Sequence, residues 1–374
     1  MRIFHLADLH IGKIVNGFSM IKEQEYILNQ IIGLIEKHQP QVVMIAGDVY
    51  DKRNPSNEAV VLFSSFLTKL TNFDLDVLIV SGNHDSGAKL QFVSEILRKQ
   101  RIHISGSFIE TIDKVTIDDE FGKVNFYLMP FVRPSDVRMF ILEVDSYHSA
   151  LQLAIANSDI DYSQRNIFVG HQFFAGTTVE QSDSEIASVG GIDIVGYSLL
   201  EDFDYAALGH LHKGQKLKHD HIRYSGSPLK YSDSEVGHQK SLVMIDFKEK
   251  ADLSLSLLEL SPKTQMRKIK GRINDILAPD FDLNHTDDFV HITLLDDEEI
   301  IDAIGKLRNK YPNLMSLQFD NRRTKHQGDI DVRDDVSESD PVELFSDFFV
   351  SQNNQTMNQR QMALVKRLME GAKN

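Results

Sequence analysis

The stretch that decides the fold reads Val42-Val43-Met44-Ile45-Ala46-Gly47-Asp48-Val49-Tyr50-Asp51. Its first five residues are apolar, and an unbroken apolar run rich in β-branched residues is typical of a strand buried on both faces of a sheet. Gly47 ends this run and Asp48 follows directly. Open α/β sheets bind ligands beyond the carboxyl ends of their strands, so Asp48 is a candidate functional residue. An ordinary turn or helix N-cap is the simpler explanation of a single such aspartate.

Four further apolar runs end in the same way. Residues 3–7 lead into Asp8-Leu9-His10, residues 77–80 into Ser81-Gly82-Asn83-His84-Asp85, residues 166–169 into Gly170-His171, and residues 205–208 into Gly209-His210-Leu211-His212. Core packing does not require polar residues at five strand ends. A shared metal centre does require them, because it needs oxygen and imidazole ligands that converge on one edge of the fold.

The composition is that of an ordinary soluble globular protein, with 374 residues, 41% hydrophobic and 25% charged. At ~100–200 residues per domain, this length allows two or three domains. The absence of cysteine excludes disulfides and thiolate metal sites and suits a reducing compartment. We see neither a signal peptide after Met1 nor an apolar run approaching ~18 residues. We therefore expect a cytoplasmic protein that does not cross a membrane.

The net charge of −15 argues against a protein that grips DNA by charge alone. Two features weaken this argument. Much of the acidic charge lies in the C-terminal third, as in residues 329–340. Bound divalent cations would also reverse the local electrostatic field at a metal site.

Residues 1–262 are expected to form the largest domain, with a layered α/β fold. Its strands alternate with helices predicted at 23–37, 58–70 and 89–99 by their apolar spacing. Later strands, predicted at 222–224, 241–247 and 253–260, follow one another closely. They suggest a second, partly antiparallel sheet, and hence a sandwich with helices outside.

Three smaller parts are expected after this domain. Residues 265–322 form a small α/β unit with strands at 289–294 and 314–319 and a helix at 298–310. Residues 323–340 form an acidic linker. Residues 341–374 form two helices, each with one apolar face, and these fit either packing on their own globule or binding of a partner.

The candidate metal ligands mix carboxylates, an amide and imidazoles, which suits Mn, Fe or Zn. They are Asp8, His10, Asp48, Asn83, His171, His210 and His212. Seven ligands are too many for one ion, whereas two ions ~3.5–4 Å apart that share a carboxylate would use them all. Asp48 is our choice for the shared ligand. Such a pair activates water and neutralises phosphoryl charge, so phosphate esters are the expected substrates.

At these residues the chain resembles the calcineurin-like metallophosphoesterases, whose blocks Asp-x-His, Gly-Asp-x-x-Asp, Gly-Asn-His-Asp, Gly-His and Gly-His-x-His occur here in order. Residues 1–13, 82–85, 205–212 and 225–228 narrow the resemblance to the SbcD family of bacterial nuclease subunits. The matching motifs cover roughly residues 1–230.

The resemblance implies a four-layer α/β/β/α sandwich with two manganese ions. Asp8, His10, Asp48 and His212 would bind one ion, and Asp48, Asn83, His171 and His210 the other. His84 would be a catalytic histidine that binds no metal. We add Asp85 as a residue that could orient the His84 ring.

The resemblance also implies ATP-dependent 3′–5′ exonuclease action on duplex DNA and endonuclease action on single strands and hairpins. It implies a homodimer through the helices at 58–70 and 89–99, a DNA-placing cap at 265–320, and tail helices that bind an SbcC-type ATPase. Lys13, Arg53, Lys89 and Lys230 are candidate DNA contacts, with solvated side chains as the alternative.

Two other functions remain open on the sequence alone. The same site would serve a phosphoprotein phosphatase or a cyclic-nucleotide phosphodiesterase, although such an enzyme needs neither the small unit nor the tail. A non-catalytic scaffold could keep the fold without its chemistry, but the intact ligand motifs and His84 argue against that.

Overall fold

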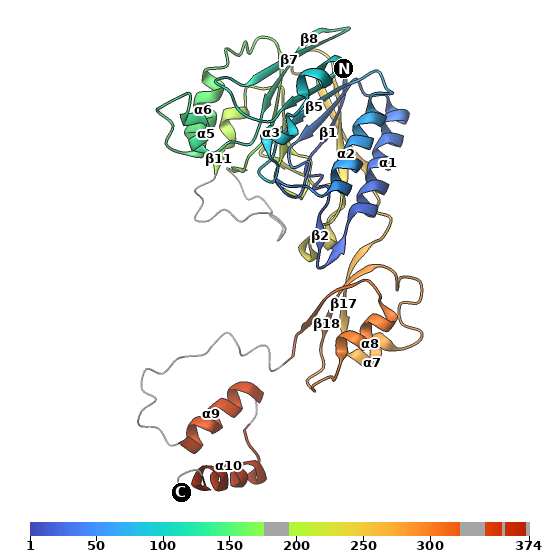
Figure 1. Ribbon diagram of the computed structural model, residues 1–374, viewed down its shortest axis with the longest axis vertical. Coiled ribbons are helices and arrows are strands. Elements are labelled where there is room, and N and C mark those ends of the chain that lie inside the picture. The colour runs from blue at the N-terminus through green and yellow to red at the C-terminus, as the bar shows by residue number, and fades with distance from the viewer. Residues whose placement is uncertain (176–193, 322–340, 354–355, 372–374) are drawn as a thin grey trace. The chain divides into compact units, whose positions relative to one another are not determined.

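The computed structural model describes residues 1–175, 194–321, 341–353 and 356–371 (Figure 1). It divides into two compact units, Met1–Gln265 and Met266–Asn374. The acidic linker expected at 323–340 lies outside the described residues. No helix in the described ranges is long and apolar enough to cross a membrane.

The first unit contains a six-stranded sheet in the order β16-β15-β1-β4-β5-β6. Its parallel strands are β1 (Arg2–Leu6), β4 (Val42–Ala46), β5 (Asp76–Val80) and β6 (Ile102–Ser105). β15 (Ser241–Phe247) and β16 (Leu253–Glu259) extend it antiparallel. The expectation that residues 241–260 belong to the second sheet is therefore wrong. β15 and β16 do form a hairpin, but β15 pairs with β1, where Val243, Ile245 and Phe247 enter the core between the sheets.

The second sheet has the order β13-β14-β12-β9-β8-β7. β14 (His219–Tyr224), β12 (Tyr205–Gly209), β9 (Arg165–His171) and β8 (Gly122–Met129) are parallel. β13 (Gln215–Leu217) and β7 (Asp113–Asp119) pair antiparallel at the two edges. The prediction of a partly antiparallel second sheet in an α/β sandwich is confirmed.

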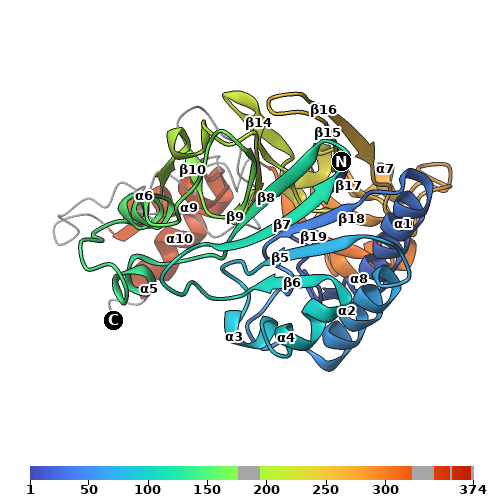
Figure 2. The ribbon, with the colours of Figure 1, turned by 90° about the horizontal axis from the view of Figure 1, so that it is seen from above.

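The two sheets pack face to face around a buried apolar core. Met44 and Leu78 of the first sheet meet Phe126, Ile167 and Ala207 of the second in this core. Because side chains alternate along a strand, buried Val43 and Ile45 point to the opposite face. Figure 2 shows α1 (Ile21–His38) and α2 (Asn57–Leu70) on that side, with α5 (Pro134–Arg138) and α6 (Tyr147–Ala156) on the other side of the molecule.

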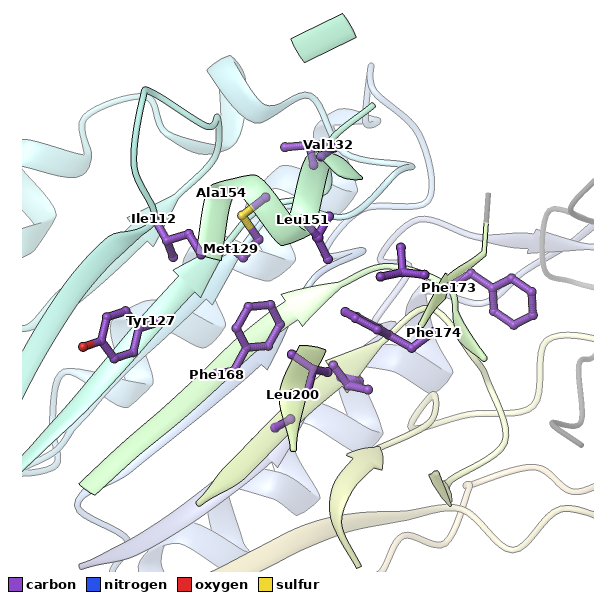
Figure 3. Close-up of a cluster of buried hydrophobic side chains, with 14 of the residues drawn as sticks. Ile112, Tyr127, Met129, Val132, Leu151, Ala154, Phe168, Phe173, Phe174 and Leu200 are labelled. Atoms are coloured by element: carbon purple, nitrogen blue, oxygen red, sulfur yellow. The ribbon is translucent and has the colours of Figure 1, made fainter. Parts of the chain in front are cut away.

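The outer face of the second sheet packs against α6. Leu151 and Ala154 of the helix lie with Met129 and Phe168 of the sheet in one buried cluster (Figure 3). Four layers result, two helical and two of sheet. This arrangement holds the carboxyl ends of strands from both sheets at one edge.

The helix expected at 89–99 is wrong. The chain forms two short helices, α3 (Gly87–Leu90) and α4 (Ser94–Leu97), interrupted at Val93, whose φ of 58° is left-handed. Phe92 and Ile96, which produced the apolar spacing, are 74% and 65% exposed. These two side chains do not pack on the core of the unit, so they do not provide the tertiary contacts that a continuous helix would need.

The second unit contains a parallel three-stranded sheet, of which Figure 1 labels β17 and β18. Its strands are β17 (Met266–Gly271), β18 (Phe289–Leu294) and β19 (Leu314–Phe319), covered by α7 (Ile273–Leu277) and α8 (Ala303–Lys310). The predicted helix at 298–310 starts later, because the Asp302 side chain caps α8 by accepting a hydrogen bond from Gly305 N. Two helices end the unit, α9 (Pro341–Asn353) and α10 (Gln359–Gly371).

The core between the sheets gives a direct stability test. Phe126 is fully buried there, so Phe126→Ala should lower the free energy of unfolding by about 3–5 kcal/mol through lost burial and a cavity. Phe121 lies in the turn between β7 and β8, and its side chain is 41% exposed. Phe121→Ala should therefore change the free energy of unfolding by less than about 0.5 kcal/mol. Chemical denaturation followed by circular dichroism compares the two, and equal losses would contradict this picture of the core.

Candidate metal centre

Five strand ends meet at one edge of the sandwich and carry all seven predicted ligands. β1, β4 and β5 lead into Asp8, His10, Asp48 and Asn83, while β9 and β12 lead into His171, His210 and His212. Asn83 and His210 are partly exposed, and the other five are buried. Both sheets therefore contribute to a single cluster.

One half of the cluster contains Asp8, His10 and His212. Ligand atoms of these three residues lie within 4.8 Å of one another. The Nε2 atoms of His10 and His212 are 3.0 Å apart. Two imidazole nitrogens this close to each other and to a carboxylate can bind the same cation.

The other half contains Asn83, His171 and His210. Asn83 Oδ1 lies 3.0 Å from His171 Nε2 and 3.3 Å from His210 Nδ1. Asp48 lies between the halves, because its Oδ2 atom is 3.6 Å from His10 Nε2 and 3.3 Å from His171 Nε2. This is the position that a carboxylate shared by two cations would occupy.

The backbone that carries these side chains is locally strained. Asp8, His10, Asp48 and His210 have φ angles of 53°, 44°, 49° and 112°. Non-glycine residues in this region are uncommon, and each costs of order 1–3 kcal/mol, which the surrounding fold must offset. Four of the seven candidate ligands therefore have an unfavourable backbone conformation that the surrounding fold holds in place, as is common at functional sites.

Glycine next to the ligands leaves room for their close approach. A Cβ atom on Gly82 would lie 2.1 Å from Asp48 Oδ1, and one on Gly47 would lie 2.2 Å from His171 Nδ1. Both distances are far below van der Waals contact, so the glycines that precede Asp48 and Asn83 in the sequence are steric requirements of the cluster.

Backbone hydrogen bonds fix the two central carboxylates. His84 N donates to Asp48 Oδ1 at 2.8 Å, and His210 N donates to Asp8 Oδ1 at 2.9 Å. Each bond ties a carboxylate to a loop of another strand. Asp48 Oδ2 stays directed at the two imidazoles described above.

The outer hydrogen bonds of two histidines fix their tautomers. His171 Nδ1 lies 2.8 Å from the carbonyl oxygen of Ala46, which can only accept, so this nitrogen carries the proton. His212 Nδ1 lies 3.2 Å from Glu235 Oε1 and donates in the same way. Once Nε2 has lost its proton, each of these two rings presents a lone pair to the cluster, as metal ligands require.

Burial and charge set the protonation of the cluster. Burial lowers the pKa of His10 and of His210 to about 3, so both rings are neutral near pH 7. Burial acts to raise the pKa of Asp48, but His171 outweighs it and holds that pKa well below its usual range. Burial acts to lower the pKa of His171, but Asp48 outweighs it and raises that pKa to about 9.

These residues fit divalent cations. Two buried carboxylates, one amide oxygen and four imidazoles form the mixed oxygen and nitrogen set that suits such ions. The proton that Asp48 favours on His171 marks a place where positive charge is stabilised. A bound cation would take the place of that proton.

His84 borders the cluster, and its ring centroid lies 4.8 Å from that of His10. Its Nδ1 atom donates to the carbonyl oxygen of Asp51 at 2.8 Å. One nitrogen of His84 also lies within 4.8 Å of ligand atoms of His10 and Asp48. Geometry thus allows His84 either to bind a metal or to act on a substrate, and substitution of His84 by alanine separates the two.

Asp85 does not orient the His84 ring, contrary to the expectation. Its carboxylate accepts backbone N–H groups of Gly82 at 2.9 Å, Tyr50 at 2.9 Å and Val49 at 3.1 Å. No hydrogen bond joins it to the His84 ring among the described residues. Burial, followed by the charge of Asp48, raises the pKa of Asp85 to about 6. Asp85 therefore ties the loop after β4 to the loop after β5.

Two further side chains beside the cluster, Glu235 and Asp51, were not among the predicted site residues. Glu235 is fully buried and binds both His212 Nδ1 and Lys240 Nζ, the latter at 2.6 Å. It lies 23 residues beyond His212, and no motif marks it. Asp51 belongs to the quoted Gly-Asp-x-x-Asp block, and its carboxylate lies 3.6 Å from His10 Nδ1. The block itself was the signal for Asp51.

The four candidate DNA-binding side chains differ in their surroundings. Lys13 pairs with Asp51 at 2.8 Å, and Lys230 donates to Val236 O at 2.7 Å. Lys89 donates to the Asn54 side chain. Arg53 is exposed and forms no ion pair with any residue in the described part of the chain. The contacts of these four side chains with DNA stay predictions.

Comparison with known proteins agrees with this geometry. The model of the calcineurin-like phosphoesterase family matches residues 1–214, more than half of the chain. The model described as the type 5 capsule protein repressor C-terminal domain matches residues 262–353.

Two curated relatives match along nearly their whole length. The SbcD component of the nuclease SbcCD from Staphylococcus epidermidis is 30% identical, with 99% of this chain and 98% of that protein covered. The protein of the same name from Staphylococcus saprophyticus is 29% identical over the same shares. With its site geometry and these matches together, the chain belongs to the calcineurin-like phosphoesterase family.

Proposed function

We propose that this chain is the nuclease subunit of an SbcCD-type complex and that it cleaves phosphodiester bonds in DNA with two divalent cations, preferentially Mn²⁺. The observation that carries the proposal is Asp48 Oδ2, which lies within 3.6 Å of imidazoles from both halves of a seven-residue ligand cluster. The two nearly full-length relatives, both named as components of the nuclease SbcCD, support DNA as the substrate.

The proposed ligand sets follow the two halves of the cluster. Asp8, His10 and His212 hold one ion, Asn83, His171 and His210 hold the other, and Asp48 serves both. When bound, such a pair lowers the pKa of a water molecule and neutralises charge that builds on the phosphoryl group.

We assign His84 to the substrate side of the centre. Its Nδ1–H is held by the Asp51 carbonyl, which leaves Nε2 to face a substrate. A protonated Nε2 can donate to the departing oxygen, a contribution typically worth ~10²–10⁴-fold in rate. We propose both exonuclease action on duplex ends and endonuclease action on single strands and hairpins.

A second copy of the chain is the proposed partner of the α2 face. Val60 and Val61 of α2 are 44% and 67% exposed, and Phe92 and Ile96 of the interrupted segment are similarly exposed. A surface cavity of about 420 Å³ lies between these elements, lined by Val60 and Phe92 among others. An exposed apolar area of this kind is typical of an interface, which supports a homodimer.

The tail helices are the proposed contact with an SbcC-type ATPase. Phe348 of α9 and Leu364 and Leu368 of α10 are 58%, 48% and 61% exposed. Residues 265–322 are proposed to act as the cap that places DNA, and the whole protein is proposed to work in the cytoplasm. The acidic segment 323–340 is proposed as a linker.

The bridging role of Asp48 predicts the loss of both ions from one substitution. Asp48→Ala should bind neither cation tightly and should lose all Mn²⁺-dependent cleavage, because both halves of the cluster lose a shared ligand. Metal analysis and calorimetric titration with Mn²⁺ measure this. The exposed residue Asp118 provides the control, since Asp118→Ala should retain two ions. Retention of two ions by Asp48→Ala would exclude the bridge.

The role of His84 predicts a separation of binding from chemistry. His84→Ala should bind Mn²⁺ and DNA nearly normally, while single-turnover cleavage falls by about 10²–10⁴-fold. His285→Ala, whose side chain is 62% exposed in the second unit, should cleave normally. Loss of one ion from His84→Ala would identify His84 as a ligand, and near-normal cleavage would remove it from the reaction.

The tail predicts a selective loss of partner binding. Deletion of residues 341–374 should leave a folded, metal-binding nuclease that no longer associates with an SbcC-type ATPase. In the full chain, Phe348→Ser with Leu368→Ser should do the same, whereas Arg360→Ser should not. Size-exclusion chromatography with the ATPase measures association. Unfolding of the truncated chain would show instead that the tail belongs to the core of its own unit.

A further inference from the structure

We propose that a cavity beside the metal centre is a subsite for one unpaired nucleotide of the DNA strand, next to the phosphate that is cleaved. The cavity has a volume of about 370 Å³ and is bordered by Gly82 and Asp85. These residues flank Asn83 and His84 in the loop after β5, so the subsite adjoins the reacting phosphate. The proposal rests on the proposed nuclease function and names how that site engages its substrate.

The base of the cavity is kept open by small residues. The loops after β5 and β6 pack backbone against backbone here, because a Cβ atom on Gly87 would lie 1.9 Å from Gly106 O. Ser81 Oγ donates to the same carbonyl at 2.8 Å, which fixes the two loops together. The volume of the cavity lies within the ~300–1,000 Å³ typical of small-ligand sites.

Aromatic side chains also line the cavity. Phe131 is anchored through its backbone N–H, which donates to Ser81 O at 2.9 Å. Its ring centroid lies 6.5 Å from that of His171, so the same ring borders the cavity and the metal centre. Phe140 also lines the cavity and is 43% exposed. Exposed aromatic rings beside a phosphodiester site are the surfaces on which unpaired bases stack.

Two arginines at this cavity are available to a ligand. Arg53 and Arg133 both line it and are exposed, and neither guanidinium forms an ion pair within the described ranges. By contrast, Lys13 and Lys240 near the centre are held by Asp51 and Glu235. Guanidinium groups both stack on bases and bind phosphate in a bidentate manner, so they suit a nucleotide better than lysines do.

The carboxylate of Asp136 determines how a nucleotide would lie in the cavity. Asp136 lines the cavity and accepts the Arg133 backbone N–H at 2.9 Å, and its remaining acceptor capacity suits an amino group of a base. A phosphate in the same place would be repelled. The base therefore enters the cavity, while its phosphates remain with the arginines and the metal centre. A space of this size holds one nucleotide and not a base pair, so the nucleotide must be unpaired.

Binding of a single-stranded thymidine hexamer, compared with the same hexamer lacking its bases, tests the proposal. Phe140→Ala and Ser107→Leu, which fills the cavity, should each weaken binding of the normal hexamer about 5- to 100-fold, the range expected for loss of a stacked base. Binding of the abasic hexamer should not change, because it presents no base to the cavity. Phe121→Ala and Arg98→Ala, both exposed and away from the cavity, are the matched controls.

Hydrolysis of bis(p-nitrophenyl) phosphate in Mn²⁺ separates this proposal from the proposed function. The Mn²⁺ content, measured by metal analysis, should be the same in the wild type, Phe140→Ala and Ser107→Leu, because none of the seven candidate ligands is changed. Failure of the wild type to hydrolyse this ester or DNA would refute the nuclease itself. With hydrolysis intact, the subsite is refuted if the variants bind the normal hexamer like the wild type, or if they weaken the abasic hexamer equally.

Discussion

The site depends on the buried carboxylates of Asp8 and Asp48, whose negative charge the surrounding residues must stabilise. An ion removed from water costs several kcal/mol unless opposite charge and hydrogen bonds surround it. Here the backbone N–H groups of His210 and His84 each donate to one of the two carboxylates. The charge of Asp48 also keeps a proton on His171 by raising its pKa to about 9. The cluster is therefore arranged to stabilise positive charge at its centre, which is the electrostatic requirement of a two-cation site.

Neither sheet could meet this condition by itself. Asp8 and Asp48 come from the first sheet, whereas His171, His210 and His212 come from the second. The apolar core between the sheets holds these strand ends at a fixed separation, and protein interiors pack too densely for that separation to drift. Left-handed backbone at the ligands is sustained by the same rigidity. The same packing between the sheets therefore stabilises the core and fixes the geometry of the site.

The convergence of the candidate ligands was predictable because the residues that suit a metal and the glycines that make room for them stand next to each other in the sequence. Gly47 and Gly82 are needed for close approach and stand directly before Asp48 and Asn83, so a strand followed by Gly and a polar residue is informative. The pairing of β15 with β1 joins residues more than 200 positions apart, and local patterns do not record such a contact. Glu235 was missed for a related reason, since it fixes the His212 tautomer from a 3₁₀ turn with no motif. Many sequence positions could provide that contact, so a motif gives the ligands more readily than the groups that orient them.

The effect of the chain's negative net charge on DNA binding depends on how the basic side chains near the site are paired. Lys13 and Lys240 are the lysines nearest the centre in the contacts described, and both are bound to carboxylates that also approach His10 or His212. Their charge stabilises the ligand scaffold and is not available for phosphate. In the proposed function, attraction for a polyanion then comes from bound cations, from Arg53 and Arg133 at the edge of the site and from the proposed ATPase partner. A net charge of −15 is compatible with a DNA substrate on these terms, because recognition depends on where positive charge is left unpaired.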